Sequence, residues 1–166
     1  MEQDSAEILV GLAELAVALA GFTGIAVAFG SRDRGGWHPG DRLRLNFLLE
    51  SSLTAGGFAL MSLVLLQLFS SSPETAWRIA SVGWSLFMPW SLYSAHRRIR
   101  DNQEQHGDID QGSNRLVFFT FSFLILVQIG NVFLWGTFAP VLAALGFNLA
   151  GSAMQFVRLI RSAFHE

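Results

Sequence analysis

The chain has 166 residues, of which 51% are hydrophobic and only 14% are charged. A typical soluble domain carries about 25% charged residues, so this composition and a mean hydropathy of +0.40 indicate a membrane protein. Cysteine and lysine are both absent, which excludes disulfides, thiolate chemistry, a Schiff base and a phosphate-binding P-loop. The net charge of −2 offers no basic surface for nucleic acid.

A membrane-spanning helix needs roughly 20 mostly apolar residues, and five segments have this length. The third is the weakest because it contains Arg78 and Pro89, although proline is tolerated where neighbouring helices satisfy the freed backbone groups. The sequence therefore predicts an all-α integral membrane protein, a five-transmembrane-helix bundle forming a single domain over 1–166. The expected spans are 8–30, 43–69, 76–96, 115–136 and 139–162, with loops at 31–42 and 97–114.

The arginines predict an orientation for this bundle. Ten of the eleven, all except Arg78, belong to the two loops or to span ends on the same side. Because positively charged residues favour the cytoplasmic side, we expect the N-terminus outside, the C-terminus inside and both loops cytoplasmic. Residues Glu2–Glu7 are acidic rather than basic, unlike the start of a signal peptide, so the first span is expected to stay in the protein.

Two carboxylates fall inside predicted spans, where a charge costs about 2.5–3.5 kcal/mol at a helix centre on insertion scales. Glu14 lies in the outer half of the first span, at the depth of Arg78. Glu50 lies in the inner half of the second, at the depth of Arg97 and Arg158. Either the carboxylates form part of an ion or proton path, or they form interhelical ion pairs with these arginines.

Uncharged polar residues recur at helical spacing within the later spans. Such faces are poorly suited to lipid and either line a hydrated path or form hydrogen bonds between packed helices. The candidate path-lining or buried polar residues, including the two carboxylates, are Glu14, Glu50, Thr54, Gln128, Asn131, Asn148, Ser152 and Gln155.

Two further patterns concern packing and lipid. In the first span, small residues stand four apart at Ala16, Ala20, Gly24 and Ala28, a spacing that lets helix backbones approach closely within a bundle or between subunits. The basic cluster Arg97, Arg98 and Arg100 either binds anionic lipid headgroups or serves only to set the topology.

Motifs for catalysis, nucleotide binding and metal binding are missing from the sequence. The four histidines, His38, His96, His106 and His165, fall in loops or at ends and none is paired at i, i+4. We therefore expect no enzyme activity, no catalytic residues, no metal and no cofactor.

Four short stretches carry a resemblance. They are Leu12–Ile25, Asp41–Arg44, Ala76–Arg78 and Gln155–Leu159, and together they resemble small bacterial integral membrane proteins of unassigned function. The resemblance implies a multi-pass protein of the bacterial inner (plasma) membrane and carries no activity with it.

Three functions stay open on the sequence. The first is an oligomeric channel or pore with a polar-lined path for ions or small solutes, formed by several copies of the chain. The second is a non-catalytic membrane subunit or scaffold that binds a partner membrane protein or a lipid. The third is a small carrier or membrane enzyme that uses Glu14 and Glu50.

Overall fold

The structure is a computed structural model that describes residues 2–30, 39–106 and 111–164. This part of the chain is helical and contains no strand, which confirms the predicted all-helical fold. The elements in chain order are α1 (Glu2–Gly30), α2 (Pro39–Leu68), α3 (Pro73–His106), α4 (Gln111–Gly130), η1 (Asn131–Trp135) and α5 (Phe138–Phe164).

The helix ends follow from local chemistry. Prolines open α2 and α3, where the missing N–H is not needed and φ is already helical. Acidic Asp41 and Glu74 lie in the first turns of these helices, where they complement the helix dipole. The single π-helical turn η1 ends at Gly136, which has a φ of +61°, a conformation that glycine adopts without steric cost.

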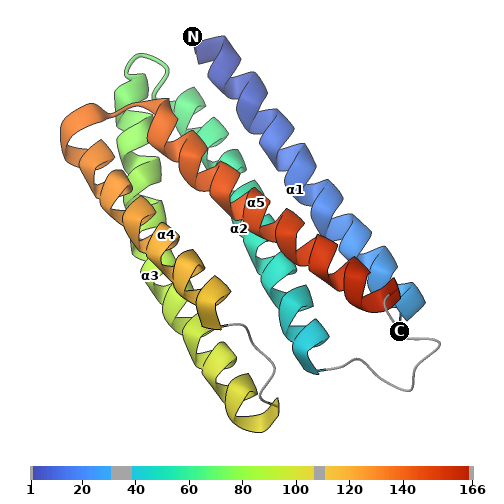
Figure 1. Ribbon diagram of the computed structural model, residues 1–166. Helices are drawn as coiled ribbons and strands as arrows, with labels where there is room; N and C mark the ends of the chain where they lie inside the picture. The colour runs from blue at the N-terminus through green and yellow to red at the C-terminus, as the bar shows by residue number, and fades with distance from the viewer. Residues whose placement is uncertain (1, 31–38, 107–110, 165–166) are drawn as a thin grey trace.

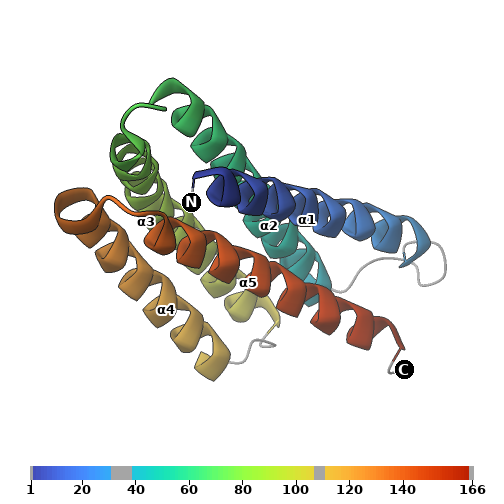
Figure 2. The same cartoon turned by 90° about the horizontal axis from the view of Figure 1, so that it is seen from above.

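The helices alternate in direction, so that α1, α3 and α5 end where α2 and α4 begin (Figure 1). Helix α2 packs against α1, α3 and α5, while α4 packs mainly against α3 and η1. Helices α4 and α5 meet at η1 and diverge toward the end of the bundle that holds the C-terminus, in both views (Figures 1 and 2). We call this the arginine-rich end, because it carries all the arginines of the described residues except Arg78.

Buried apolar residues form two main clusters along the bundle. One, with Leu9, Trp77 and Leu145 at its centre, lies in the half opposite the arginine-rich end. The other lies nearer the middle and joins Trp84 and Met88 of α3 to Leu124 of α4. Many large apolar side chains point outward, as expected for helices that face lipid rather than water.

In the part of the chain that the structure describes, four helices are long and apolar enough to cross a membrane. The segments are Asp4–Ile25, Asp41–Leu68, Arg115–Trp135 and Phe138–Arg161. Helix α3 has 34 residues and is about 51 Å long at 1.5 Å per residue. It is therefore long enough to cross a membrane, but it is less apolar than the other four helices. It also continues to His106, so the first part of the loop expected at 97–114 is helical. Residues 31–38 and 107–110 of the two expected loops lie outside the described residues.

Within the chain, the small-residue stripe of α1 is packed only in part. Ala16 is buried against α2, where a Cβ placed on Gly56 would lie 3.1 Å from the Ala16 Cβ. Ala20 is half-buried and Gly24 is exposed. Ala28 belongs to α1, but its side chain lies outside the described residues. The close approach expected from this spacing is therefore seen at Ala16, between α1 and α2.

Candidate functional site

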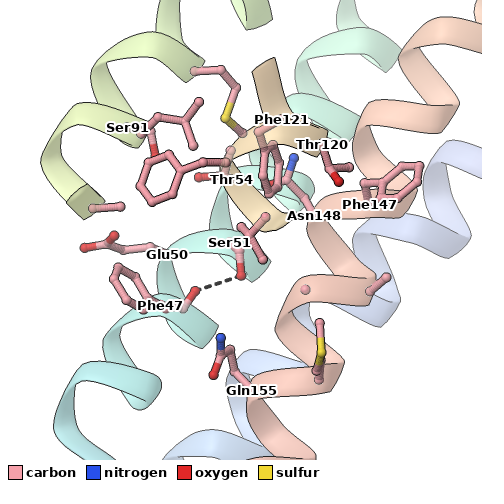
Figure 3. A pocket seen from close by; sticks show the side chains of 18 of the residues that line it. Phe47, Glu50, Ser51, Thr54, Ser91, Thr120, Phe121, Phe147, Asn148 and Gln155 are labelled. Carbon is pink, nitrogen blue, oxygen red and sulfur yellow. Dashed lines mark hydrogen bonds between the residues drawn. The ribbon is translucent and has the colours of Figure 1, made fainter. Parts of the chain in front are cut away.

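A pocket of about 330 Å³ lies among α2, α3, α4 and α5, in the half of the bundle toward the arginine-rich end (Figure 3). Helix α2, for example, contributes Phe47, Glu50, Ser51 and Thr54, which share one face at helical spacing. Four of the eight polar residues predicted from the sequence line it: Glu50, Thr54, Asn148 and Gln155. The remaining polar lining includes Ser51, Ser91, Thr120 and Arg158.

The pocket is closed toward the middle of the bundle. Met88 and Phe121 line it there and also pack in the buried cluster of Trp84 and Leu124. The rings of Trp84 and Phe121 stack with centroids 6.4 Å apart. These packed side chains separate the pocket from the opposite half of the bundle. Within one chain the pocket is therefore closed at this end.

The side of the pocket between α4 and α5 is open. The two helices diverge there (Figures 1 and 2), and the rim residues Leu116, Phe147 and Met154 are exposed. Because these rim residues are apolar and lie on helices apolar enough to cross a membrane, the opening faces the region that lipid chains would occupy.

An ion pair ties α2 to α3 at the edge of the pocket. Arg98 donates to both carboxylate oxygens of Glu50, with Nη2 lying 2.6 Å from Oε2, and its guanidinium lies 5.5 Å from the centre of the Phe47 ring. The expectation that Arg97 or Arg158 pairs with Glu50 is wrong. The rotation of α3 places Arg98 toward α2 and leaves Arg97 exposed.

On α5, the predicted polar stripe divides into two roles. Ser152 is fully buried and is hydrogen-bonded to Ser51 and to the Asn148 carbonyl, so it joins α5 to α2 behind the pocket wall. The Asn148 amide donates to the Ala144 carbonyl at 3.0 Å. Gln155 lines the pocket, and its Oε1 is buried without a hydrogen-bond partner.

Gln128 and Asn131 do not line the pocket; both are fully buried in the other half of the bundle. The Asn131 amide donates to Ser81 Oγ at 2.8 Å and to the Thr137 carbonyl at 3.0 Å, and it accepts from the Thr137 N–H at 2.9 Å. The Gln128 amide donates to the Pro140 carbonyl at 2.6 Å. These two side chains hold the α4–η1–α5 turn together.

Glu14 and Arg78, expected to pair, show no ion pair among the described residues. Glu14 is exposed on α1. The Arg78 side chain lies instead against the turn, where a Cβ on Gly136 would meet its Nε at 2.8 Å. The two carboxylates thus have different surroundings, and Glu50 alone lies at the pocket.

The described residues hold no group of three or more acidic or histidine side chains that could bind a metal. The sequence did not reveal that Arg98 is the partner of Glu50. It also did not reveal that Ser91 of α3 lines the pocket, because the residues on either side of Ser91 are apolar and form no polar pattern with it. Comparison of the chain with protein-family models, with curated proteins and with solved structures gives no match.

Proposed function

We propose that the chain is a membrane-embedded, non-catalytic binding protein whose pocket holds an apolar or amphiphilic molecule taken from the bilayer. It belongs to the second hypothesis raised by the sequence, in which the chain binds a lipid. In this proposal all five helices span the membrane, with α3 held among its apolar neighbours. The arginine-rich end faces the cytoplasm of a bacterial cell.

The single observation that carries the proposal is the shape and lining of the pocket. It is closed at Met88 and Phe121, whereas its lining residues Leu116, Phe147 and Met154 on α4 and α5 are exposed. Its volume of about 330 Å³ lies at the lower end of the range of about 300–1,000 Å³ typical of small-molecule sites, which are likewise mostly apolar with a few placed polar groups.

The channel hypothesis has less support from the same geometry. A path through one chain would have to pass the cluster of Trp84, Met88 and Leu124. Gln128 and Asn131, two of the residues expected to line the path, are occupied by hydrogen bonds within the turn. A pore between copies would need polar residues on outward faces, and the polar stripe of α5 faces α2 and the pocket instead.

Filling the pocket tests the proposal. Gly151 lines it, and a Cβ placed there meets nothing within 4 Å, so Gly151→Leu projects a side chain into the pocket without a backbone clash. Leucine is also a better helix former than glycine. We expect this variant to bind dodecanol, added as the probe to purified protein in lipid nanodiscs, at least tenfold more weakly than the unaltered chain.

Gly146→Leu is the matched control. Gly146 lies on the same helix, also has open space at its Cβ and does not line the pocket. Its dodecanol affinity should equal that of the unaltered chain. Equal affinity in all three proteins would contradict the pocket as the binding site. If the unaltered chain conducts ions in proteoliposomes, and Gly151→Leu and Gly146→Leu do not change that ion flux, the result would instead favour the channel.

A further inference from the structure

The closed end of the pocket carries an uncharged polar side chain from each of its four helices. On every helix this residue lines the pocket one helical turn away from an apolar residue that belongs to, or packs against, the cluster closing the pocket. The four pairs are Thr54 with Phe58, Ser91 with Met88, Thr120 with Leu124 and Asn148 with Ala144. We call the four polar side chains of these pairs the polar ring. Figure 3 shows them in the same part of the pocket as Phe121, well away from Gln155.

Two hydroxyl groups of the polar ring have no hydrogen-bond partner among the described residues, namely those of Thr54 and Ser91. A serine or threonine within a helix commonly donates to the carbonyl one turn earlier, as Thr120 does to Leu116 at 2.9 Å. Neither Thr54 nor Ser91 makes this bond. Both line the pocket, so their hydroxyls are able to donate to a molecule bound in it.

The other two members of the polar ring offer acceptors. The amide nitrogen of Asn148 donates to the Ala144 carbonyl at 3.0 Å, and this contact fixes which end of the amide is the oxygen. No described residue donates to that oxygen. Thr120 donates its own proton within α4 and keeps its lone pairs. The polar ring therefore holds donors and acceptors that match one hydroxyl, carbonyl or amide group of a ligand.

The charged side chains of the pocket lie further toward the arginine-rich end, and each has a partner. Both oxygens of Glu50 are bonded by Arg98, and Arg158 has an interaction of its own. No other charged side chain of the described residues lines the pocket. An ionised group at the polar ring would thus be buried without a counterion, which is costly. An uncharged polar group meets no such cost.

We infer that the closed end of the pocket binds the uncharged polar group of a neutral amphiphile, such as a long-chain alcohol, ketone or amide. Thr54 and Ser91 donate hydrogen bonds to it, and its chain extends past Gly151 toward the arginine-rich end. A carboxylate keeps its ionised end at the opening instead, with the tip of its chain at Met88 and Phe121. The inference rests on the proposed function and specifies its ligand.

The test compares two uncharged probes of equal length, dodecanol and tridecane, in which a hydroxyl replaces a methyl group. They are titrated onto purified full-length protein in nanodiscs, and each affinity is referred to the mole fraction of probe in the bilayer. The unaltered chain should bind dodecanol about tenfold more tightly than tridecane, as two hydrogen bonds allow. Thr54→Val combined with Ser91→Ala removes both donors and should reduce this preference to about twofold or less. Its affinity for tridecane should not change.

Ser62→Ala combined with Ser85→Ala is the matched control. These serines lie on the same two helices, and their hydroxyls are also buried without a partner, but they do not line the pocket. The control should keep the preference for dodecanol. Equal affinities for the two probes in the unaltered chain, or a preference that survives the loss of both donors, would overturn the inference and leave the proposed function standing. Failure of both probes to bind the unaltered chain would overturn the proposed function as well.

A third probe, dodecanoate, tests the requirement for an uncharged group. At pH 8 it should bind the unaltered chain more weakly than dodecanol does, because its carboxylate is ionised. Thr54→Val combined with Ser91→Ala should leave its affinity unchanged. Tighter binding of dodecanoate than of dodecanol would contradict the inferred preference for a neutral ligand.

Discussion

The two halves of the bundle use their polar residues in opposite ways. Toward the η1 turn, Asn131 and Gln128 are fully buried and hydrogen-bond to Ser81, Thr137 and Pro140 within the chain. Toward the arginine-rich end, Gln155 and Asn148 line an open pocket, and Gln155 keeps an unpaired oxygen. The amides of Asn131 and Gln128 thus stabilise the turn, whereas the amide oxygen of Gln155 is left without a partner at the pocket.

The difference follows from how α4 and α5 are connected. The turn at η1 and Gly136 holds the two helices together, with the Gly136 N–H donating to the Asn131 carbonyl at 2.8 Å. Further from the turn the helices diverge, and no tight connection brings their other ends together. The pocket lies in this half of the bundle, where α4 and α5 have diverged.

The largest loss of stability should come from removing the hydrogen bonds of Asn131 in the half of the bundle near η1. Replacing Asn131 by Leu removes three hydrogen bonds and leaves Ser81 and Thr137 without these partners, so we expect a loss of about 2 kcal/mol in the free energy of unfolding. Unfolding by titration with a denaturing detergent measures this loss of free energy. Asn46→Leu is the control, because Asn46 is an exposed asparagine of α2. Equal unfolding curves for the two variants would show that Asn131 does not stabilise the turn.

Gln128→Leu should have a smaller effect in the same half. It removes the bond to the Pro140 carbonyl, but it also removes the buried Oε1 that has no partner. These changes oppose each other, so the expected destabilisation is about 1 kcal/mol or less. The same titration measures it, and a loss larger than that of Asn131→Leu would reverse the ranking of the two side chains.

At the pocket edge, the Glu50–Arg98 pair should contribute little to stability. Both side chains are partly exposed, at 48% and 34%, and exposed pairs are worth about 0.2–1 kcal/mol. A double-mutant cycle of Glu50→Gln and Arg98→Gln should give a coupling energy in this range that falls with added salt. A coupling of several kcal/mol, insensitive to salt, would assign the pair to the stable core of the fold.

The smallest effect is expected at Glu14. It is exposed on α1 and has no ion pair among the described residues, so Glu14→Gln removes no contact of the fold and should not lower the free energy of unfolding. Its affinity for dodecanol should match that of the unaltered chain. Loss of binding in this variant would contradict the assignment of the pocket to the opposite half of the bundle.

Much of the fold could be predicted from the sequence, because length and hydropathy locate helices well. The break between the spans expected at 115–136 and 139–162 lies where it was predicted, since η1 ends at Trp135 and α5 begins at Phe138. The third helix continues past the span predicted at 76–96, as expected for a helical extension into the first part of the loop, and ends at His106. Polar residues do not end a helix unless a capping or breaking signal accompanies them.

The site was predictable only in part, for a geometric reason. Spacing shows which residues share a face of one helix, so the pocket residues of α5 could be grouped in advance. It does not show how far each helix is rotated toward its neighbours, and neighbouring residues point about 100° apart on a helix. Arg97 and Arg98 lie at nearly the same depth, and only the packing of α3 selects Arg98 as the partner of Glu50.

The role of Asn131 was not predictable from spacing either. It follows Gln128 at i+3 and was grouped with it as path-lining. The π-helical turn changes the direction of the backbone from Asn131 onward, and it brings the amide against Thr137 rather than into a continuous polar face. Such a turn has no strong signature in a single sequence.

The central claim is that a chain-like molecule occupies the half of the bundle at the arginine-rich end. The most direct measurement is photolabelling of the purified protein in nanodiscs with a dodecanoate that carries a diazirine at the end of its chain, followed by mass spectrometry of the labelled peptides. We expect adducts near the closed end of the pocket, at Met88 and Phe121. These adducts should be lost in Gly151→Leu and should persist in Gly146→Leu. Adducts spread over the exposed face of α1, equally in all three proteins, would contradict it.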